Sequence, residues 1–263
     1  MHKIALNTSN IIIILLPISL ITGAFVSDLS VVLLNIFFIY LLWKEKKFFF
    51  LDDPLFKYLM VFYFFISIRS LFSDDIFLSS KNALLYFRFI IFAFAISFFL
   101  DKTPSLKTKF FISCCVCFLI LIVDSYVQFI NGKNLLGWTS ENTDKLNSLF
   151  GSEAIMGSYI LKLLPIFLAL FISCLDIKKN PTYFSISLLL IISLVFLSGS
   201  RASLYLLILF IILLFIYIKE IRKNILISFI LCFATILIIA NFNNQLKVKL
   251  LLNFKDPIQR VFN

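Results

Sequence analysis

Long apolar runs recur along this chain of 263 residues, and short polar connections separate them. A run of about 17 to 20 apolar residues is long enough to cross the hydrocarbon core of a membrane as a helix. We expect the first two runs to form a tight hairpin through Ser27 and Asp28. The pattern predicts nine membrane-spanning helices, at residues 10–27, 28–43, 55–72, 82–100, 110–130, 154–174, 183–199, 201–218 and 224–240.

Basic residues are concentrated in every second connection. Lysine and arginine cluster at 44–47, 102–109, 178–179 and 219–223, whereas the intervening connections are neutral or mildly acidic. Because cytoplasmic loops carry an excess of Lys and Arg, this alternation predicts a cytoplasmic N-terminus. We expect residues 1–240 to form the transmembrane domain. Residues 241–263 would then begin a periplasmic loop of a longer protein.

Composition agrees with this topology. The chain is 61% hydrophobic and 14% charged, and its mean hydropathy is +1.04. These values argue against a soluble domain and predict an all-α, polytopic transmembrane helical bundle surrounded by membrane lipids. The net charge of +10 lies mostly in the connections, so it indicates membrane orientation and not nucleic-acid binding.

Few ionisable residues lie inside the apolar runs. Placing Arg, Lys or Asp at a helix centre costs about 2.5 to 3.5 kcal/mol, so each such residue needs a reason. Counted from the nearest outer connection, all lie about 10 to 14 Å deep or less. We expect them to form one pocket for a multiply charged anion, made by Arg69, Arg88, Asp124, Lys162 and the boundary residue Arg201.

Simpler explanations exist for two of these residues. Arg69 is close enough to the predicted outer surface for its side chain to reach water without a ligand. Asp124 could merely neutralise Arg88 or Lys162. The sequence leaves both alternatives open.

A polar segment, Leu-Ser-Gly-Ser-Arg-Ala-Ser-Leu at 197–204, separates two apolar runs. Gly199 permits a tight turn there, and Ser200 is a suitable N-cap for the next helix. Arg201 would then lie at the positive end of that helix, where the helix dipole disfavours a cation. A bound phosphate would relieve this conflict, so Ser200 and Arg201 are predicted to bind an anion.

The segment at 147–165 is the second candidate for the same site. Gly151 and Gly157 flank the predicted start of a helix, and Glu153 lies near its first turn, where a carboxylate is favoured. Lys162 follows on that helix. We expect this segment to be a shaped outer loop that leads into the anion pocket.

The sequence contains no group of residues that is a candidate for binding a metal or a cofactor. The five cysteines all lie inside apolar runs, which disfavours disulfides and metal binding, and the only histidine is His2. We therefore expect no metal and no cofactor.

Two motifs resemble a known family. Phe-Leu-Ser-Gly-Ser-Arg-Ala-Ser-Leu at 196–204 follows Leu-Phe-Gly-Ser-Glu-Ala-Ile-Met-Gly-Ser-Tyr at 149–159 and an apolar Leu-Leu-Pro run. Together they resemble the O-antigen ligase and O-antigen polymerase superfamily of bacterial inner-membrane proteins. The similarity spans much of residues 80–240, and Gly-Ser-Arg is its most informative element.

The resemblance implies a glycosyltransferase. In that family a glycan linked to undecaprenyl pyrophosphate is held at the periplasmic leaflet and passes to lipid A core or to a growing glycan, without a metal. Arg201 matches the family's arginine that engages the pyrophosphate, which implies a catalytic role for it. The family also has a large periplasmic loop with another Arg and a His as candidate general base. Arg260 is the possible match to that Arg, and the predicted topology puts His2 on the cytoplasmic side.

Other functions remain open. Ligase and polymerase use the same donor, so the sequence does not separate them. The same cationic residues would also suit a transporter or flippase for an anionic lipid or solute. A non-catalytic membrane protein of the cell envelope is a third possibility.

Overall fold

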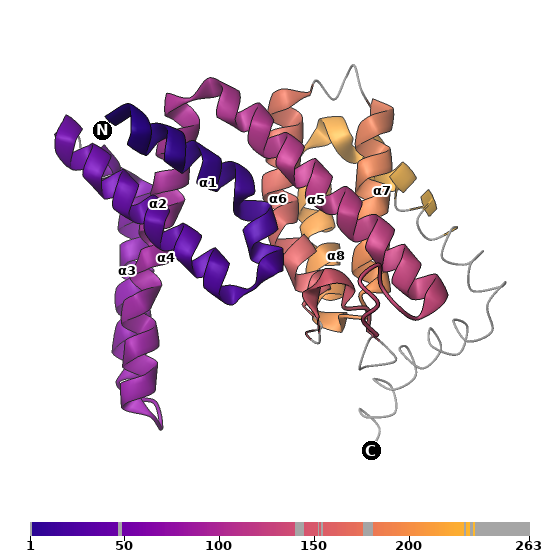
Figure 1. Cartoon of the computed structure of the whole chain (residues 1–263), viewed down its shortest axis with the longest axis horizontal. Coiled ribbons are helices and arrows are strands. Elements are labelled where there is room, and N and C mark those ends of the chain that lie inside the picture. The colour runs from indigo at the N-terminus through magenta and orange to yellow at the C-terminus, as the bar shows by residue number, and fades with distance from the viewer. Residues whose placement is uncertain are drawn as a thin grey trace. The chain divides into compact units, whose positions relative to one another are not determined.

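The structure, a computed structural model, describes residues 2–46, 49–139, 145–151, 153, 155–175, 181–228, 230, 231 and 234. These residues form helices joined by turns and loops, with one isolated antiparallel bridge between Lys133 and Thr139 (Figure 1). The all-α prediction is confirmed.

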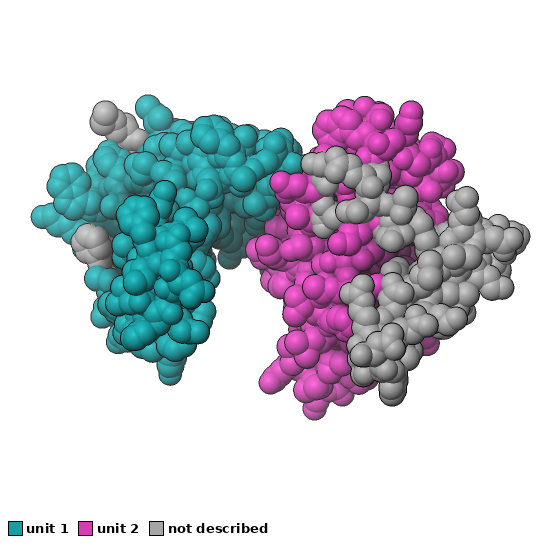
Figure 2. Space-filling model, turned by 90° about the horizontal axis from the view of Figure 1, so that it is seen from below, with its two compact units in different colours: residues 1–113 teal, residues 114–263 magenta. Residues whose placement is uncertain are grey.

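The chain forms two compact units, residues 1–113 and 114–263, which Figure 2 colours separately. Unit 1 holds α1 (His2–Thr22), α2 (Ala24–Glu45), α3 (Pro54–Ser70) and α4 (Ile76–Lys102). Unit 2 holds α6 (Met156–Cys174), α7 (Pro181–Leu197) and α8 (Arg201–Tyr217), while α5 (Pro104–Asn131) begins in unit 1 and ends in unit 2. The helices of the predicted transmembrane domain, 1–240, are therefore divided between two units.

Five of the described helices, α1, α2, α4, α5 and α6, are long and apolar enough to cross a membrane. Helices α3, α7 and α8 have 17 residues each, and α7 and α8 are also strongly apolar. The chain therefore has the helices of a membrane protein. Residues 222–228 are helical as well and correspond to the start of the ninth predicted span.

Helices α3 and α4 begin at carboxylate caps. The side chain of Asp53 accepts a hydrogen bond from the backbone N–H of Leu55 at 2.8 Å, and Pro54 occupies the first helical position. Asp75 accepts in the same way from the N–H of Leu78 at 3.0 Å. A carboxylate at this position satisfies a free donor and favours the positive end of the helix dipole.

The turn between α1 and α2 lies at Gly23, so the predicted hairpin at Ser27 and Asp28 is wrong. Gly23 has a φ of 136°, which ordinary L-residues rarely adopt. Both predicted turn residues lie inside α2. As a result, Asp28 is a helical residue on an apolar helix and not part of a loop.

Aromatic rings join α2 to α4 in unit 1. The ring of Phe38, a fully buried residue, lies 5.3 Å from the ring of Phe98 in an edge-to-face arrangement. Helix α3 packs against α4, and the two helices overlap in the view of Figure 1. Most side chains of α3 are exposed, and Ser70 is its one buried residue.

Helix α6 supplies much of the core of unit 2. Its buried side chains recur every three or four residues and include ten of its 19 positions. Phe167 stacks edge to face on Phe118 of α5 at 5.1 Å, and Phe171 does so on Phe184 of α7 at 5.3 Å. These contacts fix the long axis of α6 against both neighbours.

Candidate functional site

The two motifs singled out in the sequence meet in unit 2. Gly157 is the second residue of α6, and its backbone lies against Ser198 and Ser203. A Cβ atom at position 157 would lie 2.4 Å from Ser198 Oγ and 3.0 Å from Ser203 Oγ, so only glycine fits without a shift. Since Ser203 is the third residue of α8, the first turns of α6 and α8 are side by side.

Neither of these two helix starts has a side-chain cap among the described residues. Ile155 occupies the N-cap of α6, and it has no side-chain acceptor. Ser200 occupies the N-cap of α8, as predicted, but its hydroxyl shares a hydrogen bond with Ser203 Oγ at 2.9 Å. Helices α3 and α4, in contrast, are capped by aspartates. Within the described residues, two adjacent positive helix ends therefore lack the side-chain acceptor that caps α3 and α4.

Arg201 and Lys162 bring positive charge to the same two helices. Arg201 is the first residue of α8, and its side chain is exposed. Lys162 lies five residues after Gly157 and is also exposed. At 100° per residue, it lies about 140° around α6 from Gly157, so it does not face the contact with α8. Of these two cations, Arg201 is therefore the one that lies at the adjacent starts of α6 and α8.

Asp124 holds the loop that precedes α6. It is fully buried on α5, and its two carboxylate oxygens accept hydrogen bonds from Leu135 N at 2.9 Å and Ser148 Oγ at 2.6 Å. Both donors belong to the segment between α5 and α6. Within the described residues, Asp124 therefore forms no ion pair with Arg88 or Lys162. Its hydrogen bonds hold the loop between α5 and α6 in place.

Ser148 is the residue on which these loop bonds converge. Its φ of 50° is in the left-handed region, which is unfavourable for serine. Besides the bond to Asp124, its N–H donates to Gln128 Oε1 at 2.8 Å and its carbonyl accepts from Asn134 Nδ2 at 3.0 Å. Three bonds overcome a strain of about 1 to 3 kcal/mol. Two residues later, Phe150 stacks on Tyr159 of α6 at 5.2 Å, which ties the loop to the start of that helix.

Arg88 forms an ion pair inside unit 1. Its guanidinium donates to both carboxylate oxygens of Asp28, at 3.1 and 2.9 Å, and lies over the ring of Phe89. The two side chains are 30% and 50% exposed. Asn35 of α2 donates to the backbone carbonyl of Arg88 at 2.8 Å, so α2 and α4 share several polar contacts. This pairing gives Arg88 a structural role in unit 1.

The remaining predicted residues are distributed as follows. Arg69 is exposed at the end of α3, where it lines a groove with α4. Arg260 lies outside the described residues. Within unit 2 the structure brings Ser200 and Arg201 to the start of α6, and it places Arg69 and Arg88 in unit 1. One pocket shared by all these residues stays a prediction.

Sequence reasoning missed the partners of the buried polar groups. The sequence pattern places Asp28 in a turn. The residues around Gly23 are mostly apolar, so the pattern does not show that one helix ends and the next begins there. Gln128 and Ser148 lie in a polar segment with no apparent periodicity. One sequence feature could have predicted that Asp124 and Gln128 share a partner. They are four residues apart, which puts both side chains on one face of a helix.

Comparison with protein-family models, curated proteins and solved structures finds no match to this chain.

Replacing Gly157 by alanine should separate the starts of α6 and α8, because the new Cβ would overlap Ser198 Oγ. Overpacking of this kind costs about 1 to 3 kcal/mol. Thermal unfolding of the purified chain in detergent measures the loss. The double variant Gly157→Ala with Ser198→Ala removes the closest overlapping atom, so it should recover part of the stability. Equal melting temperatures for Gly157→Ala and the wild type would contradict the contact.

Replacing Asp124 by alanine should release the loop before α6. Each lost hydrogen bond to a carboxylate is worth about 1.5 to 3 kcal/mol, so the Leu135 amide should exchange at least about tenfold faster. Hydrogen–deuterium exchange read by mass spectrometry measures this rate. Asp124→Asn is the matched control, since its amide still accepts from Leu135 N and should keep most of the protection. Unchanged exchange in Asp124→Ala would show that other contacts hold the loop.

Replacing Asp28 by asparagine should weaken the contact between α2 and α4. The pair is partly exposed, so we expect a loss of about 0.5 to 2 kcal/mol in resistance to unfolding by denaturing detergent. The exchanged variant, Asp28→Arg with Arg88→Asp, restores opposite charges and should be more stable than either single exchange. Additive losses in that double variant would rule out a direct pair.

Proposed function

We propose that this chain is part of a membrane glycosyltransferase of the O-antigen ligase or O-antigen polymerase type. It would act in the bacterial inner membrane and move a glycan from undecaprenyl pyrophosphate to lipid A core or to a growing polysaccharide. The observation that carries the proposal is the pair of adjacent helix starts of α6 and α8, neither of which has a side-chain cap among the described residues, with Arg201 at one of them. The two resembling motifs supply these same residues.

A pyrophosphate suits this arrangement electrostatically. Backbone N–H groups at helix starts bind phosphate oxygens, and the planar guanidinium of arginine forms paired hydrogen bonds with them. In glycan transfer, an acceptor hydroxyl attacks the anomeric carbon and gives its proton to a general base, while the bond from that carbon to the pyrophosphate oxygen breaks. The leaving pyrophosphate keeps the electron pair, so negative charge develops next to Arg201. Hydrogen-bond donors that already point at this negative charge stabilise the transition state and so lower the activation barrier of glycan transfer.

The structural evidence for the other predicted binding residues differs from one residue to the next. Ser200 lies at the N-cap of α8, so its hydroxyl is close to the same N–H groups. Lys162 lies on the exposed face of α6, where it would contact the lipid-linked part of the donor rather than the paired helix starts. Arg88 already has an acidic partner in Asp28, which makes it the weaker candidate for the pyrophosphate.

The proposal includes the predicted topology of nine spans with a cytoplasmic N-terminus. The three helices of 17 residues, α3, α7 and α8, measure about 25 Å, slightly less than a hydrocarbon core of about 27 to 30 Å. Such a mismatch is accommodated by local thinning of the bilayer. With this topology the starts of α6 and α8 face the periplasm, where the lipid-linked donor is used.

Replacing Arg201 by alanine should reduce glycan transfer by about 100- to 1000-fold, the usual effect of losing one donor to a developing anion. Transfer is measured in the native host membrane, and insertion is measured separately by membrane extraction. Arg201→Lys keeps the charge but loses the paired geometry, so its activity should be intermediate.

Lys223→Ala provides the matched control. Lys223 is an exposed cation that follows α8 at its other end, and its loss should leave transfer unchanged. Wild-type transfer in an inserted Arg201→Ala protein would refute the proposed function.

A further inference from the structure

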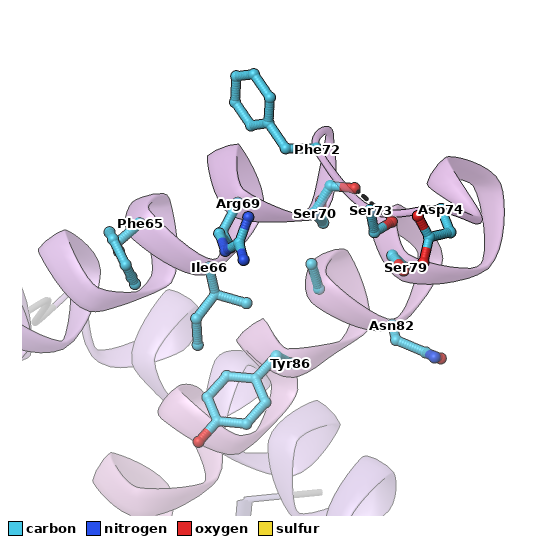
Figure 3. A pocket seen from close by; sticks show the side chains of 11 residues that line it. Phe65, Ile66, Arg69, Ser70, Phe72, Ser73, Asp74, Ser79, Asn82 and Tyr86 are labelled. Atoms are coloured by element: carbon cyan, nitrogen blue, oxygen red, sulfur yellow. Dashed lines mark hydrogen bonds between the residues drawn. The ribbon is translucent and has the colours of Figure 1, made fainter.

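A groove of about 860 Å³ lies between the end of α3 and the start of α4 in unit 1 (Figure 3). Residues of α3, of α4 and of the turn that joins these helices line the groove. The groove involves none of the residues at the starts of α6 and α8. It therefore needs an explanation that is independent of the proposed glycan transfer.

One end of the groove is polar and carries two opposite charges. Arg69 and Asp74 both line it, yet no ion pair joins them among the described residues. In Figure 3 they lie on either side of Ser70 and Ser73. Two opposite charges that line one groove without pairing leave both available to a ligand that carries the complementary pair.

The serines of the turn hold its shape. Ser70 is buried and donates to the Ser67 carbonyl at 2.7 Å, and Ser73 donates to the Ser70 carbonyl at 3.0 Å. The first bond lies within α3, and the second spans the start of the turn between the two charges. Ser79 and Asn82 of α4 line the same polar end and add further hydrogen-bonding groups.

The rest of the groove wall is apolar and aromatic. Phe65 and Ile66 of α3 lie about one turn before Arg69, and Tyr86 of α4 lies one turn after Asn82. Phe65 is 63% exposed and Tyr86 is 40% exposed, so the groove is open along this wall. A ligand that fills the groove must therefore be charged at one end and apolar at the other.

We infer that this groove binds a zwitterionic phospholipid with a primary ammonium group, of the phosphatidylethanolamine type. The lipid phosphate lies at Arg69, its ammonium lies at Asp74, and the start of an acyl chain lies along Phe65 and Tyr86. Arginine binds phosphate oxygens through paired hydrogen bonds, and a primary ammonium donates three hydrogen bonds to acceptors such as a carboxylate. The inference goes beyond the proposed function and does not depend on it.

The charges of the groove favour this lipid over other phospholipids. An anionic lipid without an ammonium would satisfy Arg69 and leave its negative charge near Asp74. A phosphatidylcholine lipid has a quaternary ammonium, which has no N–H to donate to the carboxylate. Of these three head groups, only the primary ammonium type provides hydrogen-bonding partners for both side chains.

The test measures which lipid the purified full chain retains. The chain is incorporated in nanodiscs containing equal amounts of phosphatidylethanolamine, phosphatidylglycerol and phosphatidylcholine, then transferred to detergent, and the bound lipid is identified by native mass spectrometry. We expect about a tenfold preference for phosphatidylethanolamine over each of the others, from one additional charge-assisted hydrogen bond. Asp74→Asn should abolish the preference over phosphatidylglycerol. Arg69→Gln should abolish retention of both.

Two neighbouring residues provide matched controls. Asp75→Asn removes the same charge one residue away, and asparagine still caps α4. Lys81→Gln removes an exposed cation of α4 that does not line the groove. Both variants should keep the wild-type lipid preference, and a single sharp elution peak shows that each variant is folded.

Two results would overturn the inference. Equal retention of all three lipids by the wild type would mean that the chain carries only the general lipid layer around a membrane protein. A loss of preference in Asp75→Asn as large as in Asp74→Asn would mean that surface charge, and not the groove, selects the lipid. Since glycan transfer is measured separately with Arg201 variants, failure of either idea leaves the other intact.

Discussion

The arrangement of unit 2 depends on one close contact, the backbone of α6 at Gly157 against the hydroxyls of Ser198 and Ser203. In a membrane no hydrophobic effect drives apolar helices together, so they associate where small residues allow their backbones to approach. Here Gly157 of α6 meets Ser198, in the turn after α7, and Ser203 of α8. The contact brings the first turns of α6 and α8 together and so creates two adjacent positive helix ends.

The loop before α6 makes that contact possible. Asp124 and Gln128 lie one turn apart on α5 and bind the two sides of Ser148, whose strained backbone needs such support. A buried carboxylate is costly unless its oxygens accept hydrogen bonds, and here both do. The start of α6 is therefore held by polar bonds on the loop side and by Gly157 on the side of α8.

Unit 1 uses its polar residues differently. Arg88 is paired with Asp28 on a neighbouring helix, which lowers the cost of an arginine in an apolar segment. Arg69 lies at the end of its helix and lines the same groove as Asp74, and no ion pair joins the two among the described residues. The first arrangement joins two helices, and the second is the one for which lipid binding is proposed. In unit 2, by contrast, the charge of Arg201 belongs to the proposed glycan donor site.

The hydropathy pattern was enough to locate most of the helices. Long apolar runs in a membrane can satisfy their backbone groups only as helices, and Gly and Pro interrupt them. Seven predicted segments therefore overlap α2 to α8 closely, whereas the first, 10–27, is shifted towards the C-terminus relative to α1. The sequence also identified the two polar motifs and the N-cap position of Ser200. It misplaced the first turn, because a single glycine within apolar residues gives a weak signal. Which residues of different segments meet depends on the tertiary structure, which joins Asp28 to Arg88, Asp124 to Ser148, and Gly157 to Ser198. Sequence spacing gives the depth of a residue along its helix, but the direction in which its side chain points relative to other helices depends on how those helices pack.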